Sequence, residues 1–435
     1  MKKIFNLILS MAILATAMAQ ETVYPAKEYK GLLFIKNGTV HVGNGQVLEN
    51  TTIEVRDGKI TKVGTNIAIP ADDVKVFDAA GKHVYPGLIL PNTDLGLVEI
   101  RTVRASSDVE ELGVYNPSVR SIVAYNTDSK LINPLRNVGI LLASVAPEGG
   151  TISGSSSVVQ LDAWNWEDAA YKMDNGIHYN MPALINRPNR FAAFTGAPAP
   201  TTDPIKPGLE EIENFKAFMK EAKEYNLAAD KKETNLKFEA LKGLFDKKQK
   251  LFIHCDIVRQ ILMAIDIKNE LGLDVVIVGG NESYQVADLL KKNNIPVILN
   301  QLLELPTLAD DLVDQPYRTP AILQKAGVLF ALNDDDANTR YRNLPYNAGT
   351  AAAYGLTKEE ALSAITLNTA KILGIDNVTG SIEVGKDANI VISTGDILDM
   401  RTNNITQAFI QGRTLDLNDK QKQLYERYKY KYSLK

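Results

Sequence analysis

The sequence contains one cysteine, Cys255, so the chain cannot form an internal disulfide. It carries little net charge, because 48 lysines and arginines nearly balance 52 aspartates and glutamates, which leaves −4 at pH 7. A chain so close to neutral gives no reason to expect a nucleic-acid surface. No apolar run reaches the ~20 residues that cross a bilayer. What remains is a globular chain of 435 residues, long enough for one large barrel and a smaller domain.

The N-terminus has the composition of a secretory signal peptide. Lys2 and Lys3 precede an apolar run over residues 5–17, and Ala17-Met18-Ala19 forms a small-x-small cleavage site. A membrane anchor is the competing interpretation, but the run is shorter than a membrane span. We therefore predict that residues 1–19 are removed, and that the mature protein is soluble, periplasmic and not bound to a membrane.

Short strands and tight turns over residues 31–84 predict a small β-domain. The clearest signal is the alternation over residues 52–56 and 59–63, on either side of Asp57-Gly58. An Asp-Gly pair between alternating segments favours a β-hairpin with a two-residue turn.

Strand and helix patterns alternate in the second half of the chain. The strand patterns cover residues 251–254, 274–278, 295–299 and 327–332, and helical patterns cover residues 257–271 and 283–292. This alternation predicts a parallel sheet with right-handed crossovers. A TIM barrel is favoured over an open dinucleotide-binding sheet, because no Gly-x-Gly-x-x-Gly follows a first strand. Residues 209–250 have the spacing of amphipathic helices that cover a core.

The glycine- and serine-rich run over residues 147–157 follows an apolar strand. Backbone N–H groups of such a loop can hold an anion, so we assign Glu148, Gly149, Gly150 and Ser153 to substrate binding. The run lacks the Gly-Lys-Ser/Thr ending of a phosphate loop, and a nucleotide site is therefore not expected.

Two regions allow more than one interpretation. Residues 164–207 are irregular and proline-rich, and they form either a lid over a pocket or a packed surface excursion; His178 alone does not decide between these. The tail over residues 418–435 alternates basic residues with tyrosines. A terminal helix docked through those tyrosines is the preferred interpretation, with a nucleic-acid or membrane contact as the alternative.

Residues 86–97 (PGLILPNTDLGL) run from a glycine turn into an apolar strand that ends in polar side chains. Asn92 and Asp94 are two residues apart, so on an extended chain their side chains leave the same face. Thr93 points away from that face. The end of this strand is therefore a candidate site.

This strand resembles the Pro-Gly-Leu-Ile-Asp-x-His-x-His strand that opens the barrel of the amidohydrolase superfamily. Residues 379–392 (TGSIEVGKDANIVI) resemble the C-terminal signature of the same superfamily, and the loop after residue 146 resembles that of imidazolonepropionase-like members. The resemblance implies an α/β fold with a TIM (β/α)8 barrel over residues 85–374, a smaller β-sandwich from residues 20–84 and 375–417, and the tail over residues 418–435.

The resemblance also implies where a site lies. Active members hold one or two divalent metals on two histidines of the first strand, often a carboxylated lysine or a glutamate of the fourth, one histidine each of the fifth and sixth, and an aspartate of the eighth. At the matching positions this chain has Asn92, Asp94, His254, Gly279 and Asp335. No fourth-strand lysine can be identified. The chain thus keeps one histidine and the aspartate.

The family position makes Asp335 the expected catalytic base, which takes a proton from a metal-bound water. Its place follows from its register after the eighth strand, and Asp334 and Asp336 remain alternatives.

An amide oxygen and a carboxylate replace two imidazoles in this site, which shifts its preference from zinc towards harder ions. We expect no more than one divalent metal (Mn²⁺, Mg²⁺, Ca²⁺ or Zn²⁺) on Asp94, His254 and Asp335, with Asn92 as a weaker ligand. A binuclear zinc centre is not expected, and a metal-free site stays open.

Three hypotheses for function follow. The first is a hydrolase of non-peptide C–N bonds, acting on a cyclic amide or dipeptide-like substrate through this reduced metal site. The second is a pseudo-enzyme that binds a small molecule. The third is a non-catalytic subunit that forms a hetero-oligomer with an active amidohydrolase, or a homo-oligomer. Retained His254 and the aspartate cluster favour the first, and the lost histidines favour the others.

Overall fold

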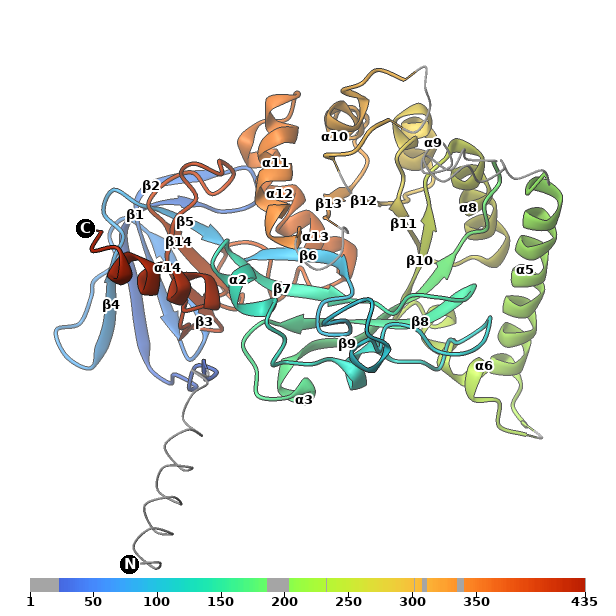
Figure 1. Ribbon diagram of the computed structural model, residues 1–435, viewed down its shortest axis with the longest axis horizontal. Coiled ribbons are helices and arrows are strands. Elements are labelled where there is room, and N and C mark those ends of the chain that lie inside the picture. Colours follow the sequence, from blue (N-terminus) through green and yellow to red (C-terminus); the bar gives the residue numbers. More distant parts are fainter. Residues whose placement is uncertain are drawn as a thin grey trace, which may run out of the picture.

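The computed structural model describes residues 23–185, 203–231, 233–300, 302–306, 311–334 and 340–434. Within these ranges the chain forms two eight-stranded sheets, seen side by side in Figure 1. The signal peptide predicted over residues 1–19 lies outside the described residues. No helix in the described ranges is long and apolar enough to cross a membrane.

The first sheet draws its strands from both ends of the chain. Its order is β16-β15-β14-β5-β1-β2-β3, with β4 beside β1. The strands are β1 (Leu32–His41), β2 (Val47–Arg56), β3 (Lys59–Gly64), β4 (Val74–Asp78), β5 (His83–Pro86), β14 (Ile390–Ser393), β15 (Ile405–Ile410) and β16 (Arg413–Thr414). The two parts meet where β5 pairs antiparallel with β14.

The predicted hairpin is confirmed. Strands β2 and β3 pair antiparallel from Arg56 opposite Lys59, and the turn between them consists of Asp57 and Gly58. Both turn residues have positive φ, 49° and 81°, which is the conformation that a two-residue primed turn requires.

The second sheet is a nearly closed barrel whose strands follow chain order from β6 to β13. They are β6 (Leu88–Thr93), β7 (Ile140–Val145), β8 (Ile152–Gln160), β9 (Ala170–Asn180), β10 (Lys250–Cys255), β11 (Val275–Gly279), β12 (Val297–Leu299) and β13 (Phe330–Leu332). All neighbours pair parallel except β8, which is antiparallel to both β7 and β9. Helix α13 (Leu367–Leu373) packs against both β13 and β6, the two edges of this sheet. The expected barrel with a β-sandwich is therefore confirmed.

Strands β8 and β9 correct two expectations. The serine-rich run was expected to be a loop, but β8 begins within it at Ile152. Residues 164–207 were expected to form a lid or a surface excursion, but β9 occupies residues 170–180 in the middle of the barrel. The physical reason is that serines fill these buried positions and find polar partners: Ser156 Oγ, for example, donates to Asn175 Oδ1 at 3.1 Å. Such strands lack an apolar signature.

Helices lie around the outside of the barrel in Figure 1. Besides α13, they are α2 (Ile132–Arg136), α3 (Trp166–Ala169), α5 (Ile205–Leu227), α6 (Leu236–Ala240), α7 (Lys242–Phe245), α8 (Val258–Leu271), α9 (Ala287–Lys292), α10 (Gln315–Ala326), α11 (Leu344–Ala353) and α12 (Lys358–Ala364). Helix α14 (Lys420–Lys431) stands apart from them. The amphipathic spacing predicted for α5 is confirmed, because Ile212, Phe215 and Met219 are fully buried.

Helix α13 closes the amino-terminal end of the barrel. Its Ile372 and Leu373 pack with barrel residues such as Phe252 in one apolar cluster. Two lysines from the starts of the neighbouring strands hold its last carbonyls: Lys250 Nζ donates to the Ile372 carbonyl at 2.6 Å, and Lys172 Nζ donates to the Gly374 carbonyl at 3.0 Å. Positive charge at a helix C-terminus is favourable. The closed end leaves the opposite, carboxyl end of the strands for a site.

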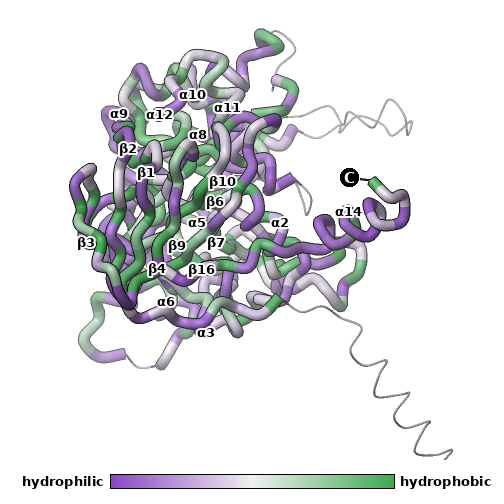
Figure 2. Tube along the Cα trace, turned by 90° about the vertical axis from the view of Figure 1, so that its left-hand side faces the viewer, coloured by the Kyte–Doolittle hydropathy of each residue, from purple (hydrophilic) through white to green (hydrophobic). Residues whose placement is uncertain are grey.

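Helix α14 corrects a further expectation. None of its residues is buried, and Tyr425, Tyr428, Tyr430 and Tyr432 are 52–88% exposed. The helix is held instead at its start, where Asp419 contacts the Asn137 amide and Lys422 Nζ donates to Asn137 Oδ1. Figure 2 shows it as a largely hydrophilic segment at the edge of the molecule.

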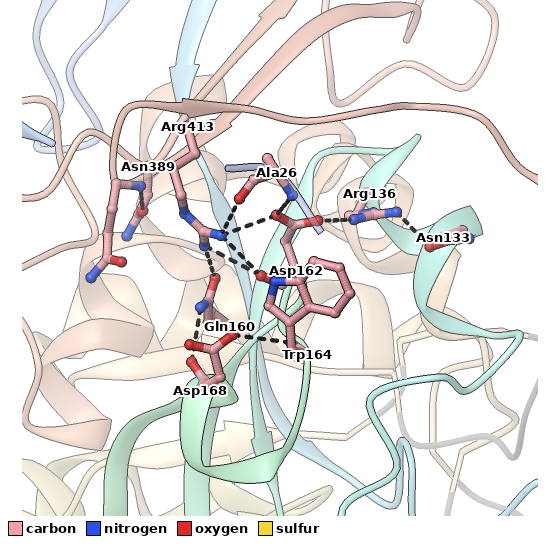
Figure 3. A network of polar contacts seen from close by, with 10 residues as sticks. Ala26, Asn133, Arg136, Gln160, Asp162, Trp164, Asp168, Asn389 and Arg413 are labelled. Carbon is pink, nitrogen blue, oxygen red and sulfur yellow. Dashed lines mark hydrogen bonds and ion pairs between the residues drawn. The ribbon is translucent and has the colours of Figure 1, made fainter. Parts of the chain in front are cut away.

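A buried polar network joins the two sheets (Figure 3). Asp162, two residues beyond β8, lies 2.5 Å from Arg136 Nη1 and 3.3 Å from Arg413 Nη1 of β16. The Asp162 side chain is 1% exposed, and those of Arg136 and Arg413 are 4% and 11% exposed. Arg413 also donates to the carbonyl of Ala26 and to the side chain of Gln160. One carboxylate therefore pairs with two buried guanidinium groups.

Candidate functional site

His254 stands at the carboxyl end of β10 and lines a cleft. It is two residues beyond Phe252 of the barrel core, so its side chain leaves the same face of the strand and lies at the mouth. The cleft has a volume of about 600 Å³. Its walls include Met181, Leu184, His254, Asp256, Gln260 and Asn300. This is the position in the barrel that the sequence predicted for His254.

A second histidine lies directly behind His254. His178 of β9 is buried, stacks on Phe252 with ring centroids 4.9 Å apart, and places its Nδ1 2.8 Å from His254 Nε2. The Nε2 of His178 is buried with no hydrogen-bond partner among the described residues. A proton on Nε2 of His178 would be buried without an acceptor, whereas a proton on Nδ1 can be donated to His254. We therefore assign Nδ1–H of His178 as the donor to His254 Nε2.

This tautomer has a consequence for His254. A neutral imidazole has one N–H and one acceptor nitrogen, and Nε2 of His254 is already the acceptor. Its proton then sits on Nδ1, the ring nitrogen that remains for the cleft. Burial lowers the pKa of His254 to about 4, and burial together with the neighbouring His254 lowers the pKa of His178 well below its ordinary value. Both rings are neutral at pH 7, and His254 offers one N–H to a bound molecule.

The end of β6 is occupied by protein contacts. Asp94 is buried, and its Oδ1 accepts a hydrogen bond from the Tyr341 hydroxyl while its Oδ2 pairs with the Arg101 guanidinium. Arg101 also lies 3.1 Å from Glu148 Oε2. Burial raises the pKa of Asp94, against the lowering effects of Tyr341 and Arg101. The neighbouring Asn92 Oδ1 is buried without a hydrogen-bond partner among the described residues.

Gly279, at the sixth-strand position, supplies no ligand and has no room for one. Its φ is +103°, and a Cβ built there would lie 2.5 Å from Asp256 Oδ1 and 2.9 Å from the Cys255 carbonyl. The carboxylate of Asp256 fills the place of a side chain. Cys255 itself is buried, and burial raises the pKa of its thiol, so the thiol stays protonated.

Gly279→Ala is expected to destabilise the fold by about 1–3 kcal/mol, because the new methyl group meets Asp256 and L residues rarely adopt this φ. Gly64→Ala is the matched control, since nothing lies within 4 Å of its Cβ position. Urea denaturation measures both variants. Equal midpoints for the two would contradict the packing described at Gly279.

Three of the residues predicted to bind substrate, Glu148, Gly149 and Gly150, lie in a turn before β8, and the fourth, Ser153, is the second residue of that strand. Gly149 and Gly150 both have positive φ, and Asn180 Nδ2, at the end of β9, donates to the Gly150 carbonyl at 2.8 Å and to Ser153 Oγ at 2.9 Å. Glu148 pairs with Arg101. Asn180 thus ties this turn to the barrel strand that carries His178.

The predicted base, Asp335, lies outside the described residues, as does Asp336. Asp334 is described: it is buried two residues beyond β13, and the Asn347 amide donates to its Oδ2 at 3.0 Å. Throughout the described ranges, no three His, Cys, Asp or Glu side chains gather into a group that could hold a metal ion. The set of Asp94, His254 and Asp335 therefore remains a prediction.

Sequence comparison places these features in a family. The profile of the Amidohydrolase family matches residues 213–415. An imidazolonepropionase of Geobacillus sp. is 24% identical over 386 residues, which cover 80% of this chain and 84% of that protein. A 5-methylthioadenosine/S-adenosylhomocysteine deaminase of Pyrococcus furiosus is 34% identical over 79 residues. That match, like two others to imidazolonepropionases, spans a fifth or less of the relative's length.

Structural comparison agrees and covers more of the chain. The crystal structure of an amidohydrolase from Thermotoga maritima superposes with a TM-score of 0.75 and 28% identity, over 88% of this chain and 99% of that one. The chain belongs to the amidohydrolase superfamily. The resemblance drawn from residues 86–97 and 379–392 is confirmed.

The superfamily generally uses divalent metals, so the described residues can be tested for such a centre. Each oxygen of Asp94 already has a donor on it, and one of the donors is a cation. Gly279 supplies no ligand, and Nε2 of His254 is taken by His178. The described donors therefore do not fit the metal centre of this amidohydrolase family.

Sequence reasoning missed His178 and Tyr341. His178 stands two residues before Asn180, so both leave the same face of β9, but the segment was not recognised as a barrel strand. Tyr341 reaches Asp94 across 247 residues of chain, and no spacing rule connects them. Arg101 lies in the irregular loop after β6, and no motif in the sequence marks it.

Proposed function

We propose that this protein is an exported, periplasmic hydrolase of non-peptide C–N bonds, acting on a cyclic amide or a dipeptide-like molecule. One observation carries the proposal: His254 presents a neutral imidazole to a 600 Å³ cleft at the end of the barrel where superfamily sites lie. Membership of the superfamily and the full-length similarity to the Thermotoga maritima amidohydrolase support it.

In this proposal the carbonyl oxygen of the substrate accepts a hydrogen bond from Nδ1–H of His254. A neutral imidazole placed where negative charge develops polarises a carbonyl without transferring its own proton. His178 keeps the ring in the required orientation and tautomer through their 2.8 Å hydrogen bond. Asp335 takes the proton of the attacking water, as the superfamily position implies. The described residues give no step that passes through a metal.

The test is hydrolysis of a panel of five- and six-membered cyclic amides and dipeptides by the purified mature protein. His254→Ala and Asp335→Asn are each expected to lower kcat/KM by about 100-fold or more. His83→Ala is the matched control, because His83 lies in the first sheet, away from the cleft. Activity that the His254 and Asp335 variants retain in full would contradict these roles.

A second candidate is a protein that binds such a molecule without cleaving it, alone or as the non-catalytic subunit of an oligomer with an active amidohydrolase. The observation that favours it is the engagement of Asp94 by Tyr341 and Arg101. Calorimetric binding of a panel compound that is never cleaved, and that His254→Ala weakens, would replace the first proposal with this one. Co-purification with a second barrel protein would distinguish the subunit from the independent binder.

A further inference from the structure

Asp94 stands where the superfamily has the second histidine ligand of its first strand. It is the only carboxylate on β6 and the residues that continue it to position 97. Its side chain is 2% exposed, so it is a negative charge held almost entirely out of water. A buried carboxylate requires a positive partner, a set of donors, or both. In a metalloenzyme the bound cation would meet part of that requirement.

In this structure Arg101 supplies the positive partner of the Asp94 carboxylate. The guanidinium comes from the loop after β6, places Nη2 on Asp94 Oδ2, and places Nη1 3.1 Å from Glu148 Oε2. Tyr341 donates to the other oxygen of Asp94. The arginine is thus held between two carboxylates from two different barrel loops, as a bridging cation would be. Its charge is fixed, because guanidinium groups do not lose their proton in proteins.

We propose that the guanidinium of Arg101 replaces a metal ion at the end of β6, so that this half of the site is organised by a cation of the chain itself. The inference holds whether the protein cleaves its ligand or only binds it. It predicts that the positive charge of Arg101, and no divalent metal, keeps Asp94 and Glu148 in place.

The first experiment measures metal dependence of the wild-type mature protein. After dialysis against Mn²⁺, Zn²⁺, Mg²⁺ or Ca²⁺, elemental analysis is expected to find no ion that Asp94→Asn removes. The melting temperature is expected to be unchanged by a chelator. A stoichiometric ion that is lost in Asp94→Asn, or a melting temperature that falls in the chelator, would overturn the proposal. Neither readout requires a substrate, so failure here is separate from failure of the proposed hydrolase.

The second experiment measures the requirement for charge. Arg101→Met is expected to lower the melting temperature by about 5 °C or more, because it leaves Asp94 buried without its cation. Arg101→Lys keeps the charge and is expected to recover part of the loss. Arg104→Met is the matched control: Arg104 is exposed in the same loop.

Adding Asp94→Asn to Arg101→Met separates a charge effect from a packing effect. The neutral amide no longer needs a cation, so the double variant is expected to melt above Arg101→Met alone. Additive losses in the double variant, or equal losses in Arg101→Met and Arg104→Met, would overturn the role of Arg101. If Arg101→Met fails to fold, the Arg101→Lys variant and the metal measurement on the wild type still decide.

Discussion

Asp162→Ala is expected to lower the free energy of unfolding by about 3–5 kcal/mol. The substitution removes the one carboxylate that lies between Arg136 and Arg413 and leaves both guanidinium groups buried beside each other. Burial already lowers the pKa of Arg136, and Asp162 opposes that effect. In the network shown in Figure 3, Asp162 is the carboxylate that forms an ion pair with each arginine, and the substitution removes both pairs at once.

The position of Asp162 makes the effect large. Arg413 belongs to β16 of the first sheet, and Arg136 belongs to α2 beside the barrel, so both halves of the molecule depend on one side chain. Asp162 Oδ2 also accepts a hydrogen bond from the Ala26 backbone at 2.9 Å, which fixes the N-terminal segment. Loss of Asp162 is therefore expected to loosen the contact between the sheets as well as the local loop.

Chemical denaturation followed by tryptophan fluorescence measures this loss, since Trp164 is two residues from Asp162. The matched control is Asp399→Ala, which removes the carboxylate of an Arg–Asp pair at the surface, where the Arg401 side chain is 87% exposed. Surface pairs contribute little, so the control is expected to unfold close to the wild type. Equal shifts in the two variants would contradict the role given to the network.

Local patterns predicted those parts of the fold that local chemistry determines. The Asp57-Gly58 turn was identified because only a few residue types accept its positive φ. The capping box at α12 is equally local: Thr357 and Glu360 are three residues apart in the sequence, and the structure shows both of its hydrogen bonds. The strand that carries His254 was recognised because apolar strand patterns alternate with helical ones, and the resemblance to the superfamily implied the role of His254 at its end.

The remaining parts depend on contacts between distant segments. Strand β8 contains many small and polar residues, among them Ser155, Ser156 and Ser157, which are buried beside β9. Without β8, the sequence offers β9 no neighbouring strand, and His178 was therefore interpreted as an isolated histidine in an irregular segment. Periodicity finds apolar faces, and the run of residues 153–157 (SGSSS) does not have one.

Only part of the site could be predicted, again because its remaining contacts join segments that are distant in the sequence. The altered residues Asn92, Asp94 and Gly279 were read directly from the motifs. What surrounds them was not: Tyr341 is far along the chain, Arg101 lies in an irregular loop, and Asp256 matters because it fills the space beside Gly279. The sequence shows where residues differ from the superfamily pattern, whereas the structure shows which side chains surround those residues.

Acidification is expected to destabilise the protein through the buried pair of His178 and His254. An unfolded histidine titrates near pH 6.5, whereas burial lowers the pKa of His254 in the folded state to about 4. Between these values the unfolded chain binds more protons, so stability falls as the pH drops below 6.5. At pH 5, His254 alone accounts for about 2 kcal/mol. His178 acts in the same direction, because burial and the neighbouring ring lower its pKa as well.

The chain has four histidines, so single variants can assign the acid sensitivity to individual residues. Burial and the charge of His41 also lower the pKa of His83, so His83, in the first sheet, contributes in the same direction. His254→Gln is expected to flatten the dependence of unfolding free energy on pH between pH 5 and 7, and the matched variant His83→Gln is expected to retain most of it. A dependence that His83→Gln abolishes and His254→Gln leaves intact would place the acid-sensitive pair in the first sheet. The neutrality of His254 at pH 7, on which its role as a hydrogen-bond donor rests, is thereby tested without a substrate.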